Sequence, residues 1–409
     1  MPLHAPSRRE LLLASGVLFA WAHMPRLARA EGRDPRLLAI VLRGALDGLA
    51  TVAPAGDPAW SALRGDKGLS LSGANPALPL DGMFALNPAM PNFHGMYRAK
   101  EALIVHAVAT PYRERSHFDG QDVLESGVNA PGSVDTGWLN RALAALESAG
   151  RVAPSEQAFA VGPITPLVVR GRAPILSWTP SRLPPAGQDT VMRLLDLYRH
   201  TDPALARALE ERVGLAAIAG AGGMQMGAQQ PGKGPAAAVR AYFAEAAGAA
   251  GKFMSRDEGP RVGALAFDGW DTHANEGAND GRLAALLAAL DGALGALKDG
   301  MGDAWRETVV VVMSEFGRTA KINGTDGTDH GTATVALLAG GAVKGGRVLA
   351  DWPGIKDANL YESRDLKPTT DLRGVLKGVL RDHLRAREKQ LAADVFPGSA
   401  SVRPMAGLV

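Results

Sequence analysis

Short, unbroken apolar runs recur along this chain, and each is followed by a polar loop. They lie at residues 37–42, 102–109, 261–267, 308–313 and 333–339, with a further strand-rich stretch at 166–178. Runs of this length without alternating polar positions are typical of parallel strands that are buried on both faces of a sheet. The pattern therefore predicts a sheet that is covered on both sides.

The segments between these strands have helical patterns. Helices are predicted at 137–149, 190–217, 236–254, 281–298 and 370–387, and one more begins after Ser116, which stands at its N-cap position. Residues 219–235 are rich in Gly, Gln and Pro without periodicity, and we expect a flexible loop there. Strands alternating with helices indicate a doubly wound α/β fold, with a mostly parallel sheet flanked by helices. In such folds the ligand site lies beyond the carboxyl ends of the strands.

The first thirty residues read as an export signal. Arg8 and Arg9 form a twin-arginine pattern, residues 11–22 are an apolar stretch, and Ala28 and Ala30 provide small residues at the spacing a signal peptidase accepts. The apolar stretch is well short of the roughly 20 residues that span a bilayer. An uncleaved amphipathic anchor is the alternative. We expect residues 31–409 to form an α/β domain that is exported folded by the twin-arginine pathway, is periplasmic or secreted, and has no stable membrane span.

Composition excludes several classes of protein. The 409 residues are 46% hydrophobic and 21% charged, which excludes disorder. The formal net charge is +2, but without the four Arg and one Glu of residues 1–30 the chain has 40 basic and 41 acidic residues. This balance gives no basic bias of the kind that binds nucleic acid. With no Cys, disulfides, thiolate zinc sites and cysteine nucleophiles are excluded.

Acids and histidines gather in the loops that follow the predicted strands. They are Asp47, Asp271, His273, Glu315, Asp329 and His330. Because the carboxyl ends of parallel strands meet at one edge, we expect these side chains to converge there. Carboxylates so close together repel one another unless they are protonated or bind cations. A mixed oxygen and imidazole set suits one or two divalent ions, zinc or manganese.

Each of these residues also has a simpler interpretation. Asp47 is placed equally well as a turn or cap residue, and Ser116 as a plain N-cap. Glu315 is three residues from Arg318 and is placed to pair with it if the strand end turns helical. His273 and His330 are explained equally well as ordinary loop histidines. Only the recurrence of the pattern after separate strands favours a shared site.

Five motifs occur in a fixed order: residues 42–48 (LRGALDG), 115–122 (RSHFDGQD), 269–275 (GWDTHAN), 314–319 (SEFGRT) and 327–331 (GTDHG). Over essentially its full mature length the chain resembles the exported bacterial family known as domain of unknown function 1501. That family looks like a branch of the alkaline-phosphatase and sulfatase superfamily. The resemblance implies an alkaline-phosphatase-like fold.

The resemblance also implies roles for individual residues. Asp47 resembles the superfamily's first acid, Ser116 its nucleophile, Asp271 and His273 its acid/His pair, and His330 its last histidine, while Glu315 falls where an Asp-His pair is usual. The chain departs from the pattern at Phe316, where a ligand histidine is expected, and at Asp329, an added acid. Because Asp271 and His273 are more closely spaced than usual, Asp268 is an alternative ligand.

The leading hypothesis is a metal-dependent hydrolase of phosphate or sulfate esters with a small anionic substrate. Ser116 would attack, and Arg115 or Arg318 would bind the anionic oxygens. The alternative is a periplasmic binding or assembly protein that keeps the fold without turnover; the sequence identifies no protein partner. A metal-free carbohydrate hydrolase is the weakest hypothesis, because aromatic platforms for sugars are sparse in a chain with 5 Tyr and 7 Trp.

Overall fold

The computed structural model describes residues 33–148, 158–161, 165–178, 235–257 and 259–409, together with the isolated positions 195, 198, 206, 207 and 209. The predicted signal at 1–30 and nearly all of the predicted loop at 219–235 lie outside the described residues, as does most of the predicted helix at 190–217. The predictions for these segments therefore stay predictions.

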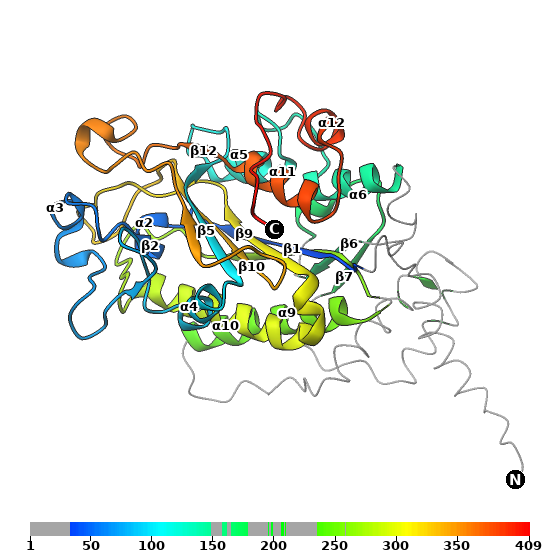
Figure 1. Cartoon of the computed structure of the whole chain (residues 1–409), viewed down its shortest axis with the longest axis horizontal. Helices are drawn as coiled ribbons and strands as arrows, with labels where there is room; N and C mark the ends of the chain where they lie inside the picture. The colour runs from blue at the N-terminus through cyan, green and yellow to red at the C-terminus, as the bar shows by residue number, and fades with distance from the viewer. Residues whose placement is uncertain are drawn as a thin grey trace, which may run out of the picture.

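A nine-stranded sheet forms the centre of the described part of the chain (Figure 1). Its order is β11-β5-β10-β9-β1-β8-β6-β7, and β12 also pairs with β5. The strands are β1 (Arg36–Arg43), β5 (Ala102–Ala109), β6 (Ala158–Val161), β7 (Ile175–Trp178), β8 (Val262–Asp268), β9 (Thr308–Ser314), β10 (Thr334–Ala339), β11 (Arg347–Leu349) and β12 (Thr370–Asp371). The five apolar runs correspond to β1, β5, β8, β9 and β10, which confirms those strand predictions. The stretch at 166–178 is strand only in β7.

Every strand pairing in this sheet is parallel except the two made by β10, which runs antiparallel to β5 and β9. The prediction of a mostly parallel sheet is confirmed. Since β10 is reversed, the loop that enters it lies at the same edge as the loops that leave β5, β8 and β9. In register, Leu42 of β1 pairs with Phe267 on one side and Ser314 on the other.

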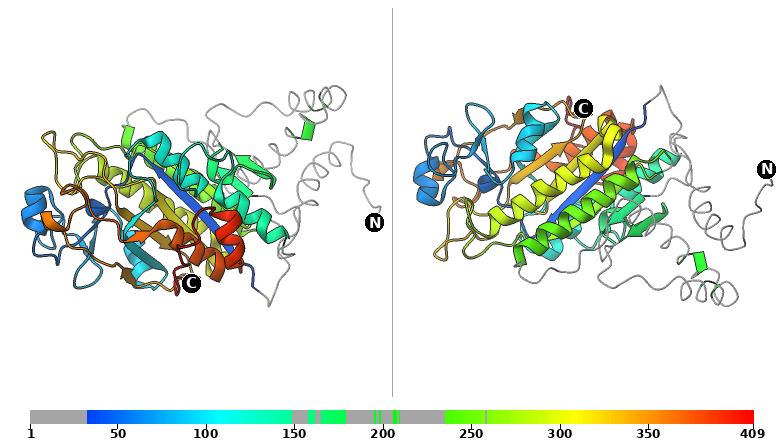
Figure 2. Two further views of the ribbon diagram at one scale, coloured as in Figure 1. Left: turned by 90° about the horizontal axis from the view of Figure 1, so that it is seen from above. Right: turned by 90° about the horizontal axis from the view of Figure 1, so that it is seen from below.

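Helices cover both faces of the sheet, as Figures 1 and 2 show. They are α2 (Gly48–Thr51), α3 (Trp60–Arg64), α4 (Pro91–Arg98), α5 (His117–Ser126), α6 (Trp138–Ser148), α9 (Pro235–Ser255), α10 (Arg282–Met301), α11 (Leu372–Asp382) and α12 (Glu388–Gln390). Alternate β1 residues face the two layers: Leu38 and Ile40 join the core under α4, α9 and α10, whereas Leu37 and Ala39 join the core under α6 and α11. This is the doubly wound architecture that the sequence predicted.

Shorter elements complete the described structure. A small sheet of order β2-β4-β3 comprises β2 (Val52–Ala53), β3 (Leu78–Pro79) and β4 (Ala85–Leu86). Single turns are η2 (Gly65–Lys67), η3 (Leu167–Val169), η4 (Gly302–Glu307), η5 (Asp357–Asn359) and η6 (Leu391–Val395).

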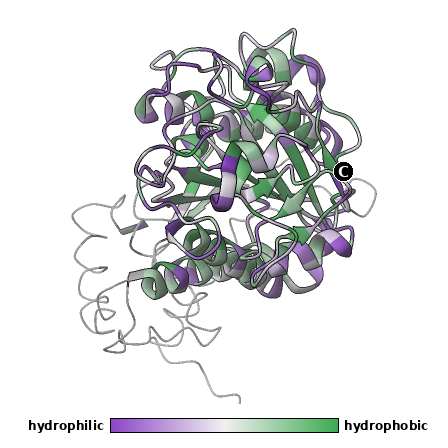
Figure 3. Cartoon of the chain, turned by 90° about the vertical axis from the view of Figure 1, so that its left-hand side faces the viewer, coloured by the Kyte–Doolittle hydropathy of each residue, from purple (hydrophilic) through white to green (hydrophobic). Residues whose placement is uncertain are grey.

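Hydropathy follows the layers. Figure 3 shows hydrophobic residues concentrated in the strands and hydrophilic ones on the outer helices and loops. The long helices α9 and α10 are rich in Ala and Leu, which are strong helix formers, and they pack against each other along one face. Within the described residues, no helix combines the length and apolarity needed to cross a membrane.

Candidate metal centre

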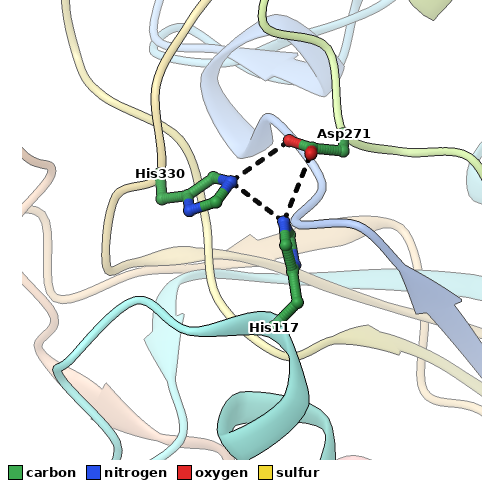
Figure 4. A group of neighbouring side chains, drawn as sticks. All are labelled: His117, Asp271 and His330. Carbon is green, nitrogen blue, oxygen red and sulfur yellow. Dashed lines mark hydrogen bonds and ion pairs between the residues drawn. The ribbon is translucent and has the colours of Figure 1, made fainter.

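Three side chains from separate loops meet at the carboxyl edge of the sheet (Figure 4). His117 begins α5, Asp271 follows β8, and His330 precedes the reversed strand β10. Nε2 of His117 lies 2.9 Å from Nε2 of His330 and 3.4 Å from Oδ2 of Asp271. Nε2 of His330 lies 3.2 Å from Oδ1 of Asp271. Among the residues that the structure describes, these three form the one group of potential metal ligands.

His273 extends this group toward the solvent. Its Nε2 atom lies 2.9 Å from Nε2 of His330 and 3.0 Å from Oδ1 of Asp271. Its side chain is 45% exposed, compared with 23% for His117 and 24% for His330. The site is therefore open to solvent on the side of His273.

The tautomers of His117, His330 and His273 follow from the hydrogen-bond partners of their Nδ1 atoms. Nδ1 of His117 lies 2.9 Å from Oε1 of Glu315, and Nδ1 of His330 lies 3.0 Å from the carbonyl oxygen of Arg115. Nδ1 of His273 lies 3.3 Å from Oδ1 of Asp329. Carbonyl and ionised carboxylate oxygens only accept hydrogen bonds, so each Nδ1 must donate. In a neutral imidazole the proton is then on Nδ1, and Nε2 presents a lone pair.

When these imidazoles are neutral, the Nε2 lone pairs of His117 and His330 and the carboxylate of Asp271 face a common point with no hydrogen between them, and Nε2 of His273 lies beside His330 and Asp271. Such an arrangement is repulsive unless a cation occupies the point. Zinc holds nitrogen and oxygen ligands at about 2.0–2.2 Å, which places tetrahedral ligand atoms roughly 3.4 Å apart. The separations of 2.9–3.4 Å between the ligand atoms of His117, Asp271 and His330 are close to this spacing. The donor set fits a divalent ion such as zinc or manganese.

Asp271 is held in its ionised form by a buried arginine. Nη1 of Arg318 lies 2.5 Å from Oδ1 of Asp271, and the Arg318 side chain has no solvent exposure. Burial works to raise the pKa of Asp271, but the hydrogen bond and charge of Arg318 outweigh it and keep that pKa below its usual value. Arg318 also donates to the hydroxyl and the carbonyl of Thr328. Its guanidinium therefore holds the Asp271 carboxylate, and the predicted role of Arg318 in binding an anionic substrate stays a prediction.

Glu315 lies one layer behind the ligands. Its Oε1 accepts from Nδ1 of His117, the backbone N–H of Gly44 and the amide of Gln121, and its Oε2 accepts from the hydroxyl of Ser314. The hydrogen bond to Glu315 raises the pKa of His117, although burial opposes the shift. Burial, reinforced by the charge of His117, instead lowers the pKa of His330. Asp329 supports His273 in the same way that Glu315 supports His117.

Asp47 has other partners. It is the N-cap of α2, where Oδ1 accepts from the backbone N–H of Ala50, and its Oδ2 lies 2.9 Å from Nη1 of the buried Arg64. The cap interpretation of Asp47 is the one that the structure shows, and its carboxylate does not join the converging ligands. The alternative ligand Asp268 is exposed at the end of β8 and is likewise not in the group.

Ser116 and Arg115 immediately precede the candidate ligand His117. Ser116 stands at the N-cap position of α5 in an extended conformation, but its side chain makes no capping hydrogen bond. Arg115 has a φ of 60°, and its carbonyl oxygen accepts the Nδ1 hydrogen of His330. Its guanidinium is paired with Glu362 and Asp365 rather than facing the ligands. As for Arg318, the predicted anion-binding role of Arg115 stays a prediction.

His117 is the ligand candidate that the sequence analysis did not assign. It lies inside the motif at 115–122, after the apolar run of β5, so it fits the same rule of a histidine in a loop after a strand. Phe316, where a ligand histidine was expected, is buried and stacks on His117 with ring centroids 5.1 Å apart. The aromatic ring thus packs against the first site and contributes no ligand to a second one.

The chain belongs to the family described as "Protein of unknown function (DUF1501)", which matches residues 98–395. None of the curated proteins compared with it matches significantly.

Among solved structures, the chain is similar to an alkaline phosphatase superfamily protein from Vibrio parahaemolyticus, with 13% identity, a TM-score of 0.33, and coverage of 85% of this chain and 72% of that one. It is also similar to the zinc complex of the C-terminal periplasmic domain of EcEptC from Escherichia coli (11% identity, TM-score 0.33, 78% and 77% covered). A third is the PsFucS1 sulfatase from Pseudoalteromonas sp. (12% identity, TM-score 0.34, 84% and 68% covered).

Proposed function

We propose that His117, Asp271 and His330, with His273 as a fourth ligand, bind one divalent metal ion, zinc or manganese. We further propose that the chain hydrolyses a small phosphate or sulfate ester at this centre. The observation that carries the proposal is the shared orientation of the imidazoles, in which each Nδ1 is tied to an oxygen and each Nε2 faces the Asp271 carboxylate. Such second-layer acceptors are the usual companions of metal-binding histidines.

The position of α5 supports an anionic substrate. The helix begins at His117, so its positive N-terminal end is at the centre, where it favours negative charge. A bound divalent ion would supply Lewis-acid polarisation of an ester oxygen. Together these two features suit a phosphoryl or sulfuryl group better than a neutral one.

Ser116 is the proposed nucleophile. Its Oγ forms a bond to the phosphorus or sulfur atom, the ester C–O oxygen leaves with the bonding electron pair and takes up a proton, and the serine proton passes to solvent. Water then hydrolyses the covalent serine ester and restores the hydroxyl. Two features support this role: Ser116 is adjacent to His117, and its side chain makes no capping bond to the helix.

A second candidate function is metal binding without turnover, as in a binding or assembly protein. It is favoured by the contacts of Arg115 and Arg318, whose guanidinium groups are paired with carboxylates of the chain itself. Measurements on purified protein separate the two functions. The metal content is determined by elemental analysis, and turnover is screened with aryl phosphate and aryl sulfate esters with added zinc or manganese. Bound metal with turnover supports the hydrolase, and stoichiometric metal with none favours the second candidate.

We also propose that residues 1–30 direct export of the folded chain to the periplasm or the medium. The twin-arginine pattern of Arg8 and Arg9 supports this. Replacing both with Lys is expected to retain the protein in the cytoplasm, and fractionation of cells that express each form tests it. Equal export of both forms would contradict a twin-arginine route.

A further inference from the structure

A buried acid joins the two loops that carry the candidate ligands. Glu276 is 2% exposed, and its two carboxyl oxygens have threonine partners on different loops. Oε1 lies 2.9 Å from the hydroxyl of Thr272, the residue between Asp271 and His273. Oε2 lies 3.1 Å from the hydroxyl of Thr328, two residues before His330. Glu276 therefore contacts a neighbour of each of these ligands without contacting a ligand itself.

The contacts continue from Thr328 to the ligand carboxylate. Nε of Arg318 donates to the hydroxyl oxygen of Thr328 at 3.1 Å, and Nη1 of Arg318 donates to Asp271. The Thr328 hydroxyl has one hydrogen. When it donates this hydrogen to Glu276, its oxygen lone pair is free to accept the hydrogen bond from Arg318. Glu276 thus fixes the rotation of the Thr328 hydroxyl, and through it the position of the guanidinium that holds Asp271.

Backbone contacts bring the same two loops together. The N–H of Thr328 donates to the carbonyl of Thr272 at 3.2 Å, and the N–H of Glu276 donates to the carbonyl of Asp326 at 2.9 Å. The N–H of Asn275 donates to the carbonyl of Thr325 at 2.9 Å. The backbone sets the register between the loops, and the side-chain contacts of Glu276 complete it in the buried layer below the ligands.

Burial favours the neutral form of the Glu276 carboxyl group. Burial, reinforced by the nearby Asp47 carboxylate, raises the pKa of Glu276 to about 8. Both threonine hydroxyls donate to the ionised carboxylate, whereas in the neutral form Oε2 accepts from Thr328 and the protonated Oε1 donates to the hydroxyl of Thr272. A glutamine amide offers the same pair of functions.

We propose that Glu276 is a positioning residue of the metal centre, which holds Asp271 and His330 at binding distance through Thr272, Thr328 and Arg318. The inference rests on the proposed metal function. Removing a partner that is hydrogen-bonded directly to a ligand typically weakens metal binding about 10- to 100-fold, and because Glu276 acts one contact further out we expect the lower end of this range.

The test measures zinc affinity by competition with a chromophoric chelator, and the visible absorption of the cobalt-substituted full-length protein. Glu276→Ala is expected to weaken zinc binding about 10-fold or more and to alter the cobalt spectrum, whereas Glu276→Gln stays within about threefold of wild type. Asp291→Ala is the matched control. Asp291 is also a buried acid, 3% exposed, but it accepts the backbone N–H groups of Asn92 and Phe93 away from the ligands. Its replacement is expected to lower stability and leave zinc affinity unchanged.

Four outcomes would overturn the inference. Wild-type zinc affinity and cobalt spectrum in Glu276→Ala would overturn the inference, as would equal losses in the Gln and Ala variants. If Glu276→Ala does not fold, the near-isosteric Thr328→Val takes its place, and wild-type affinity in that variant overturns the inference in the same way. A wild-type chain that binds no zinc would refute the metal function itself, and the inference with it.

Discussion

Nδ1 of His117 lies 2.9 Å from Oε1 of Glu315, a carboxylate whose side chain has no solvent exposure. The two residues come from loops after β5 and β9, which are separated in the sheet by β10. Because the Glu315 oxygens are taken up by His117, Gly44, Gln121 and Ser314, the carboxylate orients the imidazole and directs its Nε2 atom to the centre. The relationship explains why an acid in this motif sits behind the ligands.

We predict that Glu315→Gln lowers the pKa of His117 in the metal-free protein. The hydrogen bond to the Glu315 carboxylate is the largest cause of the raised pKa, and a neutral amide cannot replace its charge. Zinc affinity is expected to fall about 10-fold, because the ligand becomes less basic. An NMR titration of the imidazole signals and a zinc titration check both effects. An unchanged His117 pKa would contradict the orienting role.

Replacing Asp47 is expected to affect stability and not metal content. Asp47→Ala leaves Arg64, whose side chain is 2% exposed, as a buried cation without its carboxylate. Breaking a buried ion pair in this way costs about 3–5 kcal/mol. Chemical unfolding and elemental analysis measure the two effects, with the exposed Asp268→Ala as the control that changes neither. Loss of metal from folded Asp47→Ala protein would show that Asp47 is a ligand after all.

Ser116→Ala distinguishes a nucleophile from a cap. Loss of a capping hydroxyl costs about 1 kcal/mol, but the Ser116 side chain makes no capping bond. We therefore expect an unchanged melting temperature and metal content, together with loss of ester turnover by orders of magnitude. Thermal unfolding and a steady-state assay on the same preparation provide the readouts. Full turnover in the variant would exclude the covalent route.

The stability of the metal-free protein is expected to depend on pH through Glu276. Its pKa rises from 4.5 to about 8 on folding, so between these values the folded state keeps a proton that the unfolded state has released. Stability from this group is complete below the unfolded pKa and is lost as pH rises toward the folded pKa. The free energy of unfolding of wild type should therefore fall relative to Glu276→Gln between about pH 5 and about pH 8. Denaturant titrations at several pH values measure it, and a constant difference would contradict the raised pKa.

Much of the fold follows from the apolar runs. Buried parallel strands need unbroken hydrophobic stretches, and the stretches at β1, β5, β8, β9 and β10 are long enough to be recognised in the sequence. The reversal of β10 could not be predicted, since an apolar run has no direction. The two-residue strands β2, β3 and β4 are too short to give a periodic signal.

The site was predictable in outline and not in detail. The rule that ligand residues follow strands identified Asp271, His273 and His330, which the structure brings together. The rule does not distinguish a candidate ligand from the residue that supports it, because Glu315 and Asp329 also lie in loops at strand ends, as the candidate ligands do. That distinction depends on which side chain is buried and on its hydrogen-bond partners. His117 is not singled out by the rule, because it stands at the start of α5 and not directly after β5.

The central claim is tested most directly by the stoichiometry of zinc on the purified protein. Elemental analysis after dialysis against a weak chelator is expected to give one ion per chain in wild type and in the control His94→Ala, since His94 Nε2 instead lies 2.9 Å from the carbonyl oxygen of Pro79. His330→Ala removes the Nε2 atom that lies 2.9 Å from both His117 and His273, and it is expected to abolish binding. Equal metal content in wild type and His330→Ala, or none in wild type after incubation with zinc or manganese, would contradict the account.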